Sequence, residues 1–162
     1  MSDNGSFRLG REGIDIGSNA PLRNGGVTCW EGGIRVAAFA RYPGKIPAGV
    51  VIDEPLWSPD LMTACRVLAQ MPQVNRVSLD GANPLPVLYG NGKSSSRSFY
   101  FDYKNHSALR WGQWKIVREL PTKPWQLYDL SSDLGEERNL AATLPGKVRE
   151  LVAARAAWRQ SF

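Results

Sequence analysis

The feature that most constrains this chain is a mostly apolar run over residues 34–42, which reads IRVAAFARY. It lacks regular polar alternation, which is typical of a strand buried on both faces of a sheet. Such a strand needs neighbouring strands. Residues 1–33 are rich in Gly, Asn, Ser and Arg and predict a long loop, so they supply none. The run therefore predicts a strand in a sheet that is larger than the first third of this sequence can form.

A helix is expected to begin at Ser58, because Ser is a favoured N-cap and Pro59 and Asp60 suit the first helical turn. The helix should end before Pro72, which cannot continue it. Its apolar residues follow helical spacing and are Leu61, Cys65 and Leu68, with Met62 and Ala69 beside them.

Short strands are predicted farther along the chain, and Gly112 suits a tight turn between two of them. A last helix is expected over 145–159, with an apolar stripe of Val148, Leu151, Val152 and Trp158. The predicted strands are 98–103, 107–111, 113–118 and 125–130. The order of elements is thus loop, buried strand, helix, loop, antiparallel strands and helix.

Composition sets broad limits on function. The 162 residues are 43% hydrophobic and 22% charged, which is typical of a folded domain. No stretch reaches the ~20 apolar residues of a membrane helix, and residues 1–10 lack the apolar segment of a signal peptide. The net charge of +5 is spread along the chain without a basic run, so we expect neither a membrane nor a nucleic-acid partner. Cys29 and Cys65 form no metal-binding motif and are interpreted as buried thiols, with a disulfide as the alternative.

Several motifs occur in one order along the chain. Residues 2–5 read SDNG, whose carboxylate and amide oxygens suit a hard cation such as Ca²⁺, although Asx-Gly by itself is foremost a turn. Residues 21–36 read PLRNGGVTCWEGGIRV. The later segments are RYPGKIPAG over 41–49, WSPDL over 57–61, ALRWGQWKIV over 108–117 and WQLYDL over 125–130, followed by Asp133, Glu136, Glu137, Asn139 and Leu140.

This series resembles the arylsulfatase-type sulfatases. Residues 21–36 are similar to their P-L-R-G-G-K-G-T-x-Y-E-G-G-I-R-V-P segment, which follows an S-D-N-G motif, and the later segments match in the same order. The resemblance covers nearly the whole chain except about 66–97. It implies the C-terminal part of an alkaline-phosphatase-like α/β/α core, followed by a small antiparallel sheet with a packed C-terminal helix. Residues 1–80 would finish the catalytic domain and 81–162 would form the C-terminal subdomain.

The resemblance also implies a chemistry. In this family a cysteine or serine converted to formylglycine attacks the sulfur of a sulfate ester, and a divalent cation, usually Ca²⁺, binds the sulfate oxygens. Metal and cationic groups stabilise charge that develops on those oxygens. The residues that match the family's metal ligands are Asp3 and Asn4.

Two departures from the family pattern bear on activity. The nucleophile motif, Cys or Ser followed by x-Pro/Ala-x-Arg, is absent, and residues 19–23 have Asn at the reacting position. The family lysine that contacts sulfate falls on Gly26, which carries no cation. We therefore expect the isolated chain to be inactive, and its missing partner to be the N-terminal half of the enzyme.

His106 is the only histidine, so it is either a surface residue or a contact to the sulfate-ester substrate. Trp111, Trp114 and Trp125 suit packing between the small sheet and the last helix better than a sugar-stacking face. Two further functions stay open beside catalysis. One is a non-enzymatic module that binds sulfated glycans, and the other is a truncated or split-gene product.

Overall fold

The computed structural model describes residues 1–9, 14–15, 17–72, 79–94 and 97–161. The chain forms two compact units. The larger unit comprises Met1–Ala38 and Ser96–Phe162, and the smaller unit comprises Phe39–Ser95. The division into domains 1–80 and 81–162 stays a prediction.

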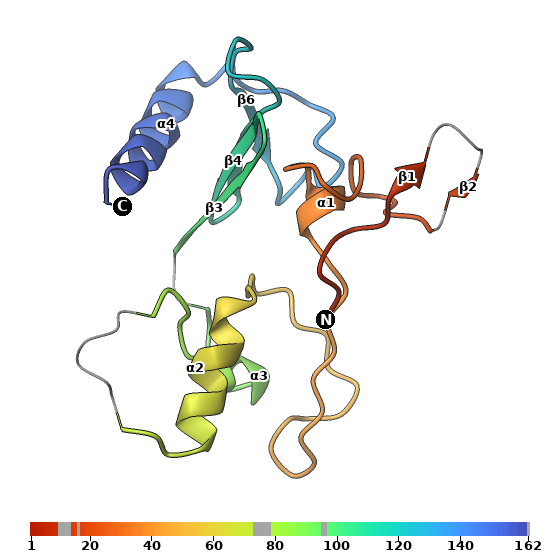
Figure 1. Ribbon diagram of the computed structural model, residues 1–162, viewed down its shortest axis with the longest axis vertical. Coiled ribbons are helices and arrows are strands. Elements are labelled where there is room, and N and C mark those ends of the chain that lie inside the picture. The colour runs from red at the N-terminus through yellow and green to blue at the C-terminus, as the bar shows by residue number, and fades with distance from the viewer. Residues whose placement is uncertain (10–13, 16, 73–78, 95–96, 162) are drawn as a thin grey trace. The chain divides into compact units, whose positions relative to one another are not determined.

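The larger unit is organised by a four-stranded antiparallel sheet, shown in green and cyan in Figure 1. Its strands pair in sequence order as β3-β4-β5-β6. Their bounds are Ser98–Tyr103 for β3, His106–Trp111 for β4, Trp114–Arg118 for β5 and Gln126–Asp129 for β6. All four predicted strands are confirmed to within one residue at each end. Gly112 has a φ of +60° in the β4–β5 turn, a conformation that glycine adopts without steric cost.

Each face of this sheet carries its own hydrophobic cluster, because successive side chains on a strand point to opposite sides. On one face Ala108, Val117 and Tyr128 pack with Cys29 and Trp30 from the loop before α1 (Glu31–Ile34). On the other face the buried side chains are Leu109, Ile116, Leu127 and Leu151. The sheet is thus a middle layer between the N-terminal loop and the C-terminal helix, as Figure 1 shows for α1 and α4.

The C-terminal helix α4 spans Pro145–Arg159, as the sequence predicted. Its predicted apolar stripe faces the sheet, with Leu151 1% exposed. Trp158 stacks on Tyr100 of β3, with ring centroids 4.3 Å apart. Buried Arg155 forms an ion pair with Asp102 of β3, which ties the helix to the edge strand of the sheet.

The N-terminal part of the larger unit adds one small hairpin. β1 (Arg8–Leu9) pairs antiparallel with β2 (Ile14–Asp15). The rest of the described residues before α1 form turns and irregular structure, which agrees with the predicted loop.

The smaller unit contains helices α2 (Pro59–Leu68) and α3 (Leu85–Leu88) and no strand among its described residues. The predicted α2 is confirmed, with Pro59 at its first position, although the Ser58 side chain makes no capping hydrogen bond. The buried hydrophobic residues of this unit are Ala64, Leu85 and Val87. No helix in the described part of the chain is long and apolar enough to span a bilayer.

The predicted buried strand over 34–42 is wrong. Ile34 ends α1, and residues 35–42 form no regular element. Phe39, at the centre of the run, is 92% exposed. The physical reason is the missing partner: the sole backbone hydrogen bond to residues 37–41 from the described chain is donated by Ser2 N–H to the Ala37 carbonyl.

Candidate functional site

The site is built from two segments of the larger unit, residues 2–6 and 19–33. Asn19 joins them, because its Oδ1 accepts a hydrogen bond from Ser6 N–H at 2.8 Å and its Nδ2 donates to the Ser6 carbonyl at 2.8 Å. The same Nδ2 also donates to the Asn24 carbonyl at 3.0 Å. The sequence offered Asn19 only as a mismatch to a nucleophile. The structure makes it the residue that holds the two segments together.

Backbone contacts bring the two segments closer still. Gly5 N–H donates to the Gly33 carbonyl at 3.1 Å, and Gly26 N–H donates to the Ser6 carbonyl at 3.0 Å. A Cβ on Gly5 would lie 1.7 Å from the Gly32 carbonyl oxygen, so no other residue fits there without a backbone shift. The segment that carries Asp3 and Asn4 is therefore fixed against the loop 19–33.

Asp3 and Asn4 lie at the start of this arrangement. Asp3 is exposed and its Oδ1 accepts a hydrogen bond from Asn4 N–H at 2.9 Å. Ser2 Oγ donates to the Asn4 carbonyl at 2.8 Å. Their carboxylate and amide oxygens are the donors that hard cations prefer. Within the described residues no group of three or more His, Cys, Asp or Glu side chains could hold a metal ion.

Gly26, where the family carries a lysine, has no room for a side chain. A Cβ here would lie 2.7 Å from the Gly5 carbonyl oxygen and 3.2 Å from the Phe7 ring. The next residue, Val27, has a φ of +61°, which is strained for a β-branched residue. A side chain at position 26 would therefore collide with the Gly5 carbonyl and the Phe7 ring.

A buried ionic cluster lies beneath the loop. Lys115 Nζ is 3.0 Å from Glu31 Oε1 and 2.7 Å from Glu136 Oε1, and all three side chains are at most 1% exposed. Glu136 Oε2 accepts a hydrogen bond from Glu31 N–H at 2.7 Å. Arg110 Nη1 lies 3.7 Å from Glu31 Oε2. Two buried carboxylates thus share the buried Lys115, and the partly exposed Arg110 lies beside one of them, between α1 and the sheet.

Burial sets the electrostatics of this cluster. Desolvation raises the pKa of Glu136, and it outweighs the lowering effect of Lys115. Removing one partner would leave an uncompensated charge in the interior, which is far costlier than the pair itself is favourable. The cluster therefore links Glu31, the first residue of α1, to Lys115 of β5 and to Glu136, which follows β6.

Arg23 extends the same connection. Its Nη1 donates to the Glu136 carbonyl at 2.7 Å and to Tyr128 Oη at 3.2 Å, and its guanidinium lies 3.7 Å from the centroid of the Trp30 ring. Burial raises the pKa of Tyr128, although the charge of Arg23 beside it acts in the opposite direction.

The sequence analysis missed this cluster as a unit. All its members lie in segments that match the family, but they are separated by up to 105 residues. A buried lysine is rare unless it is paired. The apolar neighbours of Lys115 in the run WKIV were the one available signal that it lies inside the fold.

His106 is the first residue of β4 and lies opposite Tyr103 of β3. It is half-buried, and its Nδ1 is buried without a hydrogen-bond partner in the described part of the chain. No hydrogen bond or ion pair among the described residues joins it to Asp3 or Asn4. The two predicted metal ligands are neighbours in the sequence, and their role, like that of the predicted substrate residue on the sheet, stays a prediction.

The cysteines and tryptophans divide between interior and surface. Cys29 is a buried free thiol, and burial raises its pKa to about 11. Cys65 is free and exposed, so its prediction as a buried thiol is wrong. Trp114 and Trp125 pack against the cluster between sheet and α4, as predicted. Trp111 does not, since it is 39% exposed at the end of β4.

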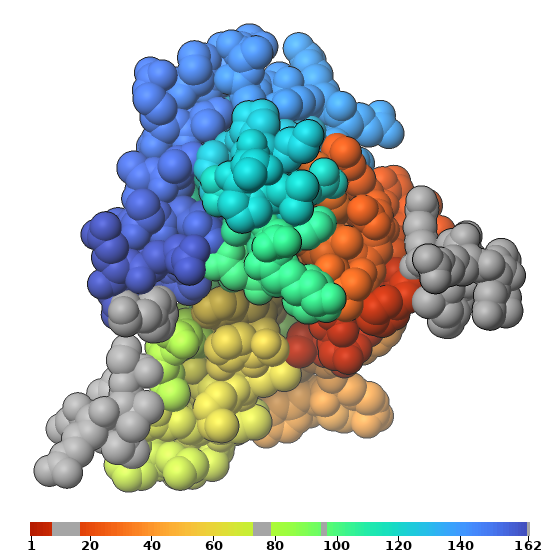
Figure 2. Space-filling view, turned by 45° about the horizontal axis from the view of Figure 1, so that its top comes forward, coloured from red at the N-terminus to blue at the C-terminus, as the bar shows by residue number. Residues whose placement is uncertain are grey.

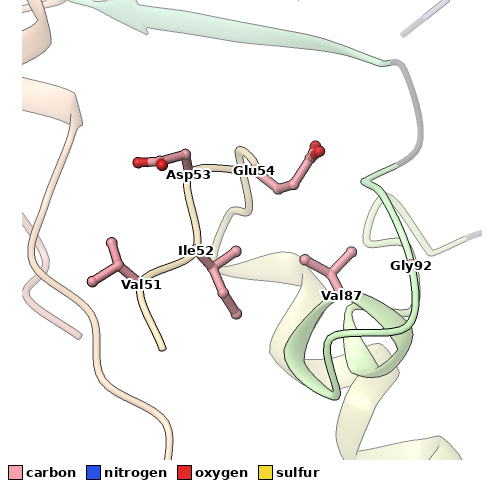
Figure 3. A pocket seen from close by; sticks show the side chains of 6 residues that line it. All are labelled: Val51, Ile52, Asp53, Glu54, Val87 and Gly92. Carbon is pink, nitrogen blue, oxygen red and sulfur yellow. The ribbon is translucent and has the colours of Figure 1, made fainter. Parts of the chain in front are cut away.

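The smaller unit has a shallow hollow of about 410 Å³, lined by Val51, Ile52, Asp53, Glu54, Val87 and Gly92. Figure 3 shows that the Asp53 and Glu54 side chains point away from each other. Glu54 accepts a hydrogen bond from Ser94 N–H at 3.3 Å. Because the two carboxylates do not converge, the hollow lacks the paired geometry that acid–base chemistry or metal binding needs.

Comparison with known proteins gives this geometry a family. No protein-family model matches the chain. It is 33% identical to human arylsulfatase A in an alignment 182 residues long, which covers 94% of this chain and 35% of that protein. It is 33% identical to N-acetylgalactosamine-6-sulfatase of Canis lupus familiaris over 86% of this chain. Over 60% of its length it is 38% identical to human steryl-sulfatase.

Solved structures agree at the level of fold. The chain superposes with a TM-score of 0.79 on Ps i-CgsB, solved in complex with k-i-k-neocarrahexaose, over 97% of this chain and 35% of that one, at 24% identity. A Bacteroides thetaiotaomicron structure concerned with the metabolism of multiple glycosaminoglycans matches with a TM-score of 0.67 at 25% identity. The chain, with its small antiparallel sheet and packed C-terminal helix, thus has the mixed α/β fold of this part of an alkaline-phosphatase-like sulfatase structure, as the motifs predicted.

The chain belongs to the sulfatases, and among them it is of the arylsulfatase type. It spans between 17% and 35% of the length of the curated relatives named above.

Proposed function

We propose that this chain is the C-terminal portion of a sulfuric-ester hydrolase and supplies part of its metal site. The observation that carries the proposal is the fixing of the Asp3–Asn4 segment on the loop 19–33 through Gly5 and Asn19. A ligand pair held this way loses little conformational freedom when a metal binds, which favours binding.

The metal we propose is Ca²⁺, with the Asp3 carboxylate and the Asn4 side-chain amide as two of its ligands. Ca²⁺ takes about 6–8 oxygen ligands, so the remaining ligands must come from groups outside this pair. When bound, the metal supplies positive charge to the sulfate oxygens. The role of the chain itself is to hold two oxygens at one place on a rigid loop.

The isolated chain is proposed to be inactive, because no residue in it matches the formylglycine motif and Gly26 replaces the family's sulfate-binding lysine. The backbone around Gly26 supports this view, since the Gly5 carbonyl and the Phe7 ring occupy the space that a side chain there would need. Turnover of an aryl sulfate by the pure, Ca²⁺-supplemented chain would contradict the proposal.

The substrate we propose is a sulfate ester, with sulfated glycans as the favoured class. The relatives are named for aryl, steryl and N-acetylgalactosamine sulfates, and the structural neighbour holds a neocarrahexaose. His106 is proposed as a substrate contact because its side chain is only half-buried at the start of β4.

The test uses the longer polypeptide encoded when the reading frame is extended upstream of the Met1 codon. Asp3→Ala should abolish Ca²⁺-dependent hydrolysis of an aryl sulfate and lower Ca²⁺ affinity. Asp53→Ala is the matched control, because Asp53 is an exposed carboxylate in the smaller unit. Unchanged Ca²⁺ affinity in Asp3→Ala would refute the ligand role.

A second candidate is a non-enzymatic module that binds sulfated glycans. It is favoured by the exposed Trp111 and the net charge of +5. Saturable heparin binding that weakens with salt, and that Trp111→Ala reduces, would favour this function over catalysis.

A further inference from the structure

Three Asn–Gly pairs occur in this chain, at residues 4–5, 24–25 and 91–92. In such a pair the backbone nitrogen of the glycine can attack the side-chain amide carbon of the asparagine. Glycine favours this attack because it has no Cβ and leaves the backbone free to turn. The reaction needs a glycine N–H that is not engaged elsewhere and a peptide unit that can rotate, and the three pairs differ in both respects.

The first pair, Asn4–Gly5, is held on both sides of its peptide unit. Gly5 N–H donates to the Gly33 carbonyl at 3.1 Å, and the Asn4 carbonyl accepts a hydrogen bond from Ser2 Oγ at 2.8 Å. Figure 2 shows the N-terminal segment, in dark red, directly against the orange loop that contains Gly33. This peptide unit cannot rotate without breaking both hydrogen bonds.

The second pair, Asn24–Gly25, is held in a similar way although Asn24 itself is exposed. The Asn24 carbonyl accepts a hydrogen bond from Asn19 Nδ2 at 3.0 Å, and Gly25 N–H donates to Asn24 Oδ1 at 2.9 Å. Gly25 is buried so closely that a Cβ there would lie 2.2 Å from the Ser6 carbonyl oxygen. The packing around Gly25 therefore opposes rotation of this peptide unit.

The third pair, Asn91–Gly92, follows α3 in the smaller unit, and both of its residues are exposed. Asn91 N–H donates to the Pro86 carbonyl at 2.9 Å, which holds the chain just before the pair. Within the described residues, neither the Asn91 carbonyl and side chain nor Gly92 N–H makes a hydrogen bond. Of the three peptide units, this one is the freest to rotate into the geometry that the attack requires.

We propose that Asn91 is a site of spontaneous deamidation in the folded protein, and that the fold protects Asn4 and Asn24 from the same reaction. The Gly92 nitrogen loses its proton to hydroxide and forms a bond to Asn91 Cγ. The bond from Cγ to Nδ2 breaks, and the side-chain nitrogen takes a proton from water and leaves as ammonia. Water then opens the cyclic imide at either carbonyl carbon, which gives aspartate or isoaspartate, and no other reactant is needed.

The modification changes the border of the hollow in the smaller unit. Gly92 lines this hollow together with Asp53 and Glu54, and Figure 3 shows Gly92 at its edge. Deamidation of the residue before Gly92 adds a negative charge beside this wall, and isoaspartate also inserts a methylene group into the main chain. The reaction thus alters the smaller unit and spares the segment that carries Asp3 and Asn4, whatever the function of that segment.

Incubation of the purified 162-residue protein at mildly alkaline pH, followed by peptide mapping with mass spectrometry, measures the rate at each pair. Asn91 should deamidate at least tenfold faster than Asn4 and Asn24, and isoaspartate should be found at residue 91. Asn91→Gln should remove the acidic species that isoelectric focusing detects, because glutamine would have to form a less favourable six-membered ring. The change is made at Asn91 because a Cβ at Gly92 would lie 2.8 Å from Pro86 Cβ.

The same protein unfolded in guanidinium chloride is the control, because it keeps the three Asn–Gly pairs and removes the contacts around them. All three pairs should then react at similar rates, with Asn4 and Asn24 at least tenfold faster than in the folded protein. Equal rates at the three pairs in the folded protein would overturn the proposed protection. A rate at Asn91 that is tenfold lower in the folded than in the unfolded protein would overturn the proposed site.

Discussion

The two units of this protein distribute their apolar side chains in opposite ways. In the larger unit the sheet is covered on one face by Cys29 and Trp30 and on the other by α4. In the smaller unit only Ala64, Leu85 and Val87 are buried hydrophobics among the described residues, while most of the apolar residues of α2 are exposed. The larger unit has its own core, whereas the smaller unit holds its helix mainly through backbone and polar contacts.

This difference shows which part of the chain specifies its own structure. Burying apolar surface contributes about 25 cal/mol per Å², and the larger unit gains this on both faces of its sheet. The smaller unit gains little of it, so we expect it to open more readily than the larger one.

The largest effect is expected at the buried ionic cluster of the larger unit. Lys115→Met leaves Glu31 and Glu136 without their shared cation and should lower the free energy of unfolding by about 3–5 kcal/mol. Urea denaturation followed by tryptophan fluorescence measures this. Lys45→Met, at an exposed lysine of the smaller unit, is the control and should change it by less than about 0.5 kcal/mol. Equal changes in the free energy of unfolding for the two variants would show that the buried cluster does not stabilise the larger unit.

The next effect compares one leucine from each long helix. Leu151→Ala removes a 1% exposed side chain of α4 and should cost about 2–5 kcal/mol. Leu68→Ala removes a 48% exposed side chain of α2 and should cost less than about 1 kcal/mol. Thermal and urea unfolding of both variants measure the difference. A cost at Leu68 equal to that at Leu151 would show that α2 is packed in solution.

The pH dependence gives a smaller effect of defined sign. Burial raises the folded-state pKa of Glu136 above its usual 4.5, so its contribution to stability is present below pH 4.5 and is lost as the pH rises through the folded pKa. The hydrogen bond from Ser131 lowers the pKa of Asp129, so that residue contributes above pH 3.8 and loses its contribution as the pH falls.

Urea unfolding between pH 3 and 7 tests both signs. The unchanged protein should lose stability as the pH rises above 4.5, and Glu136→Gln should remove that loss. It should also lose stability as the pH falls below about 3.8, and Asp129→Asn should remove that second loss. Identical changes in the two pH profiles would contradict the assignment of opposite shifts.

The smallest effect concerns the strained loop. Val27→Gly should raise the free energy of unfolding by about 1 kcal/mol, because glycine adopts the φ of +61° without steric conflict and Val27 is 42% exposed. Gly26→Ala should lower it, because its Cβ would lie 2.7 Å from the Gly5 carbonyl oxygen. The melting temperature should therefore rise for Val27→Gly and fall for Gly26→Ala. A lower melting temperature for Val27→Gly would show that the backbone at Val27 is not strained.

Much of the larger unit could be predicted from local pattern. The strands from Ser98 to Asp129 and the helix Pro145–Arg159 follow from side-chain alternation, turn glycine and helical spacing, which act over a few residues. The assignment of Asp3 and Asn4 as metal ligands rests on their order relative to later motifs and stays a prediction. The role of Asn19 was not, because its partner Ser6 lies 13 residues away and its hydrogen bonds go to backbone atoms.

The sequence by itself determined the family, through the order of its motifs, and the positions of the four strands and of α4, because turn and helix patterns act between neighbours in the chain. Only the tertiary structure decided that Lys115, Glu31 and Glu136 share one buried site and that Gly26 has no room for a side chain. It also decided that residues 34–42 form no strand here, since a strand exists only through hydrogen bonds to a partner. Burial and strand pairing depend on residues that are distant in the sequence, and the local sequence pattern does not show which of these residues lie nearby in the fold.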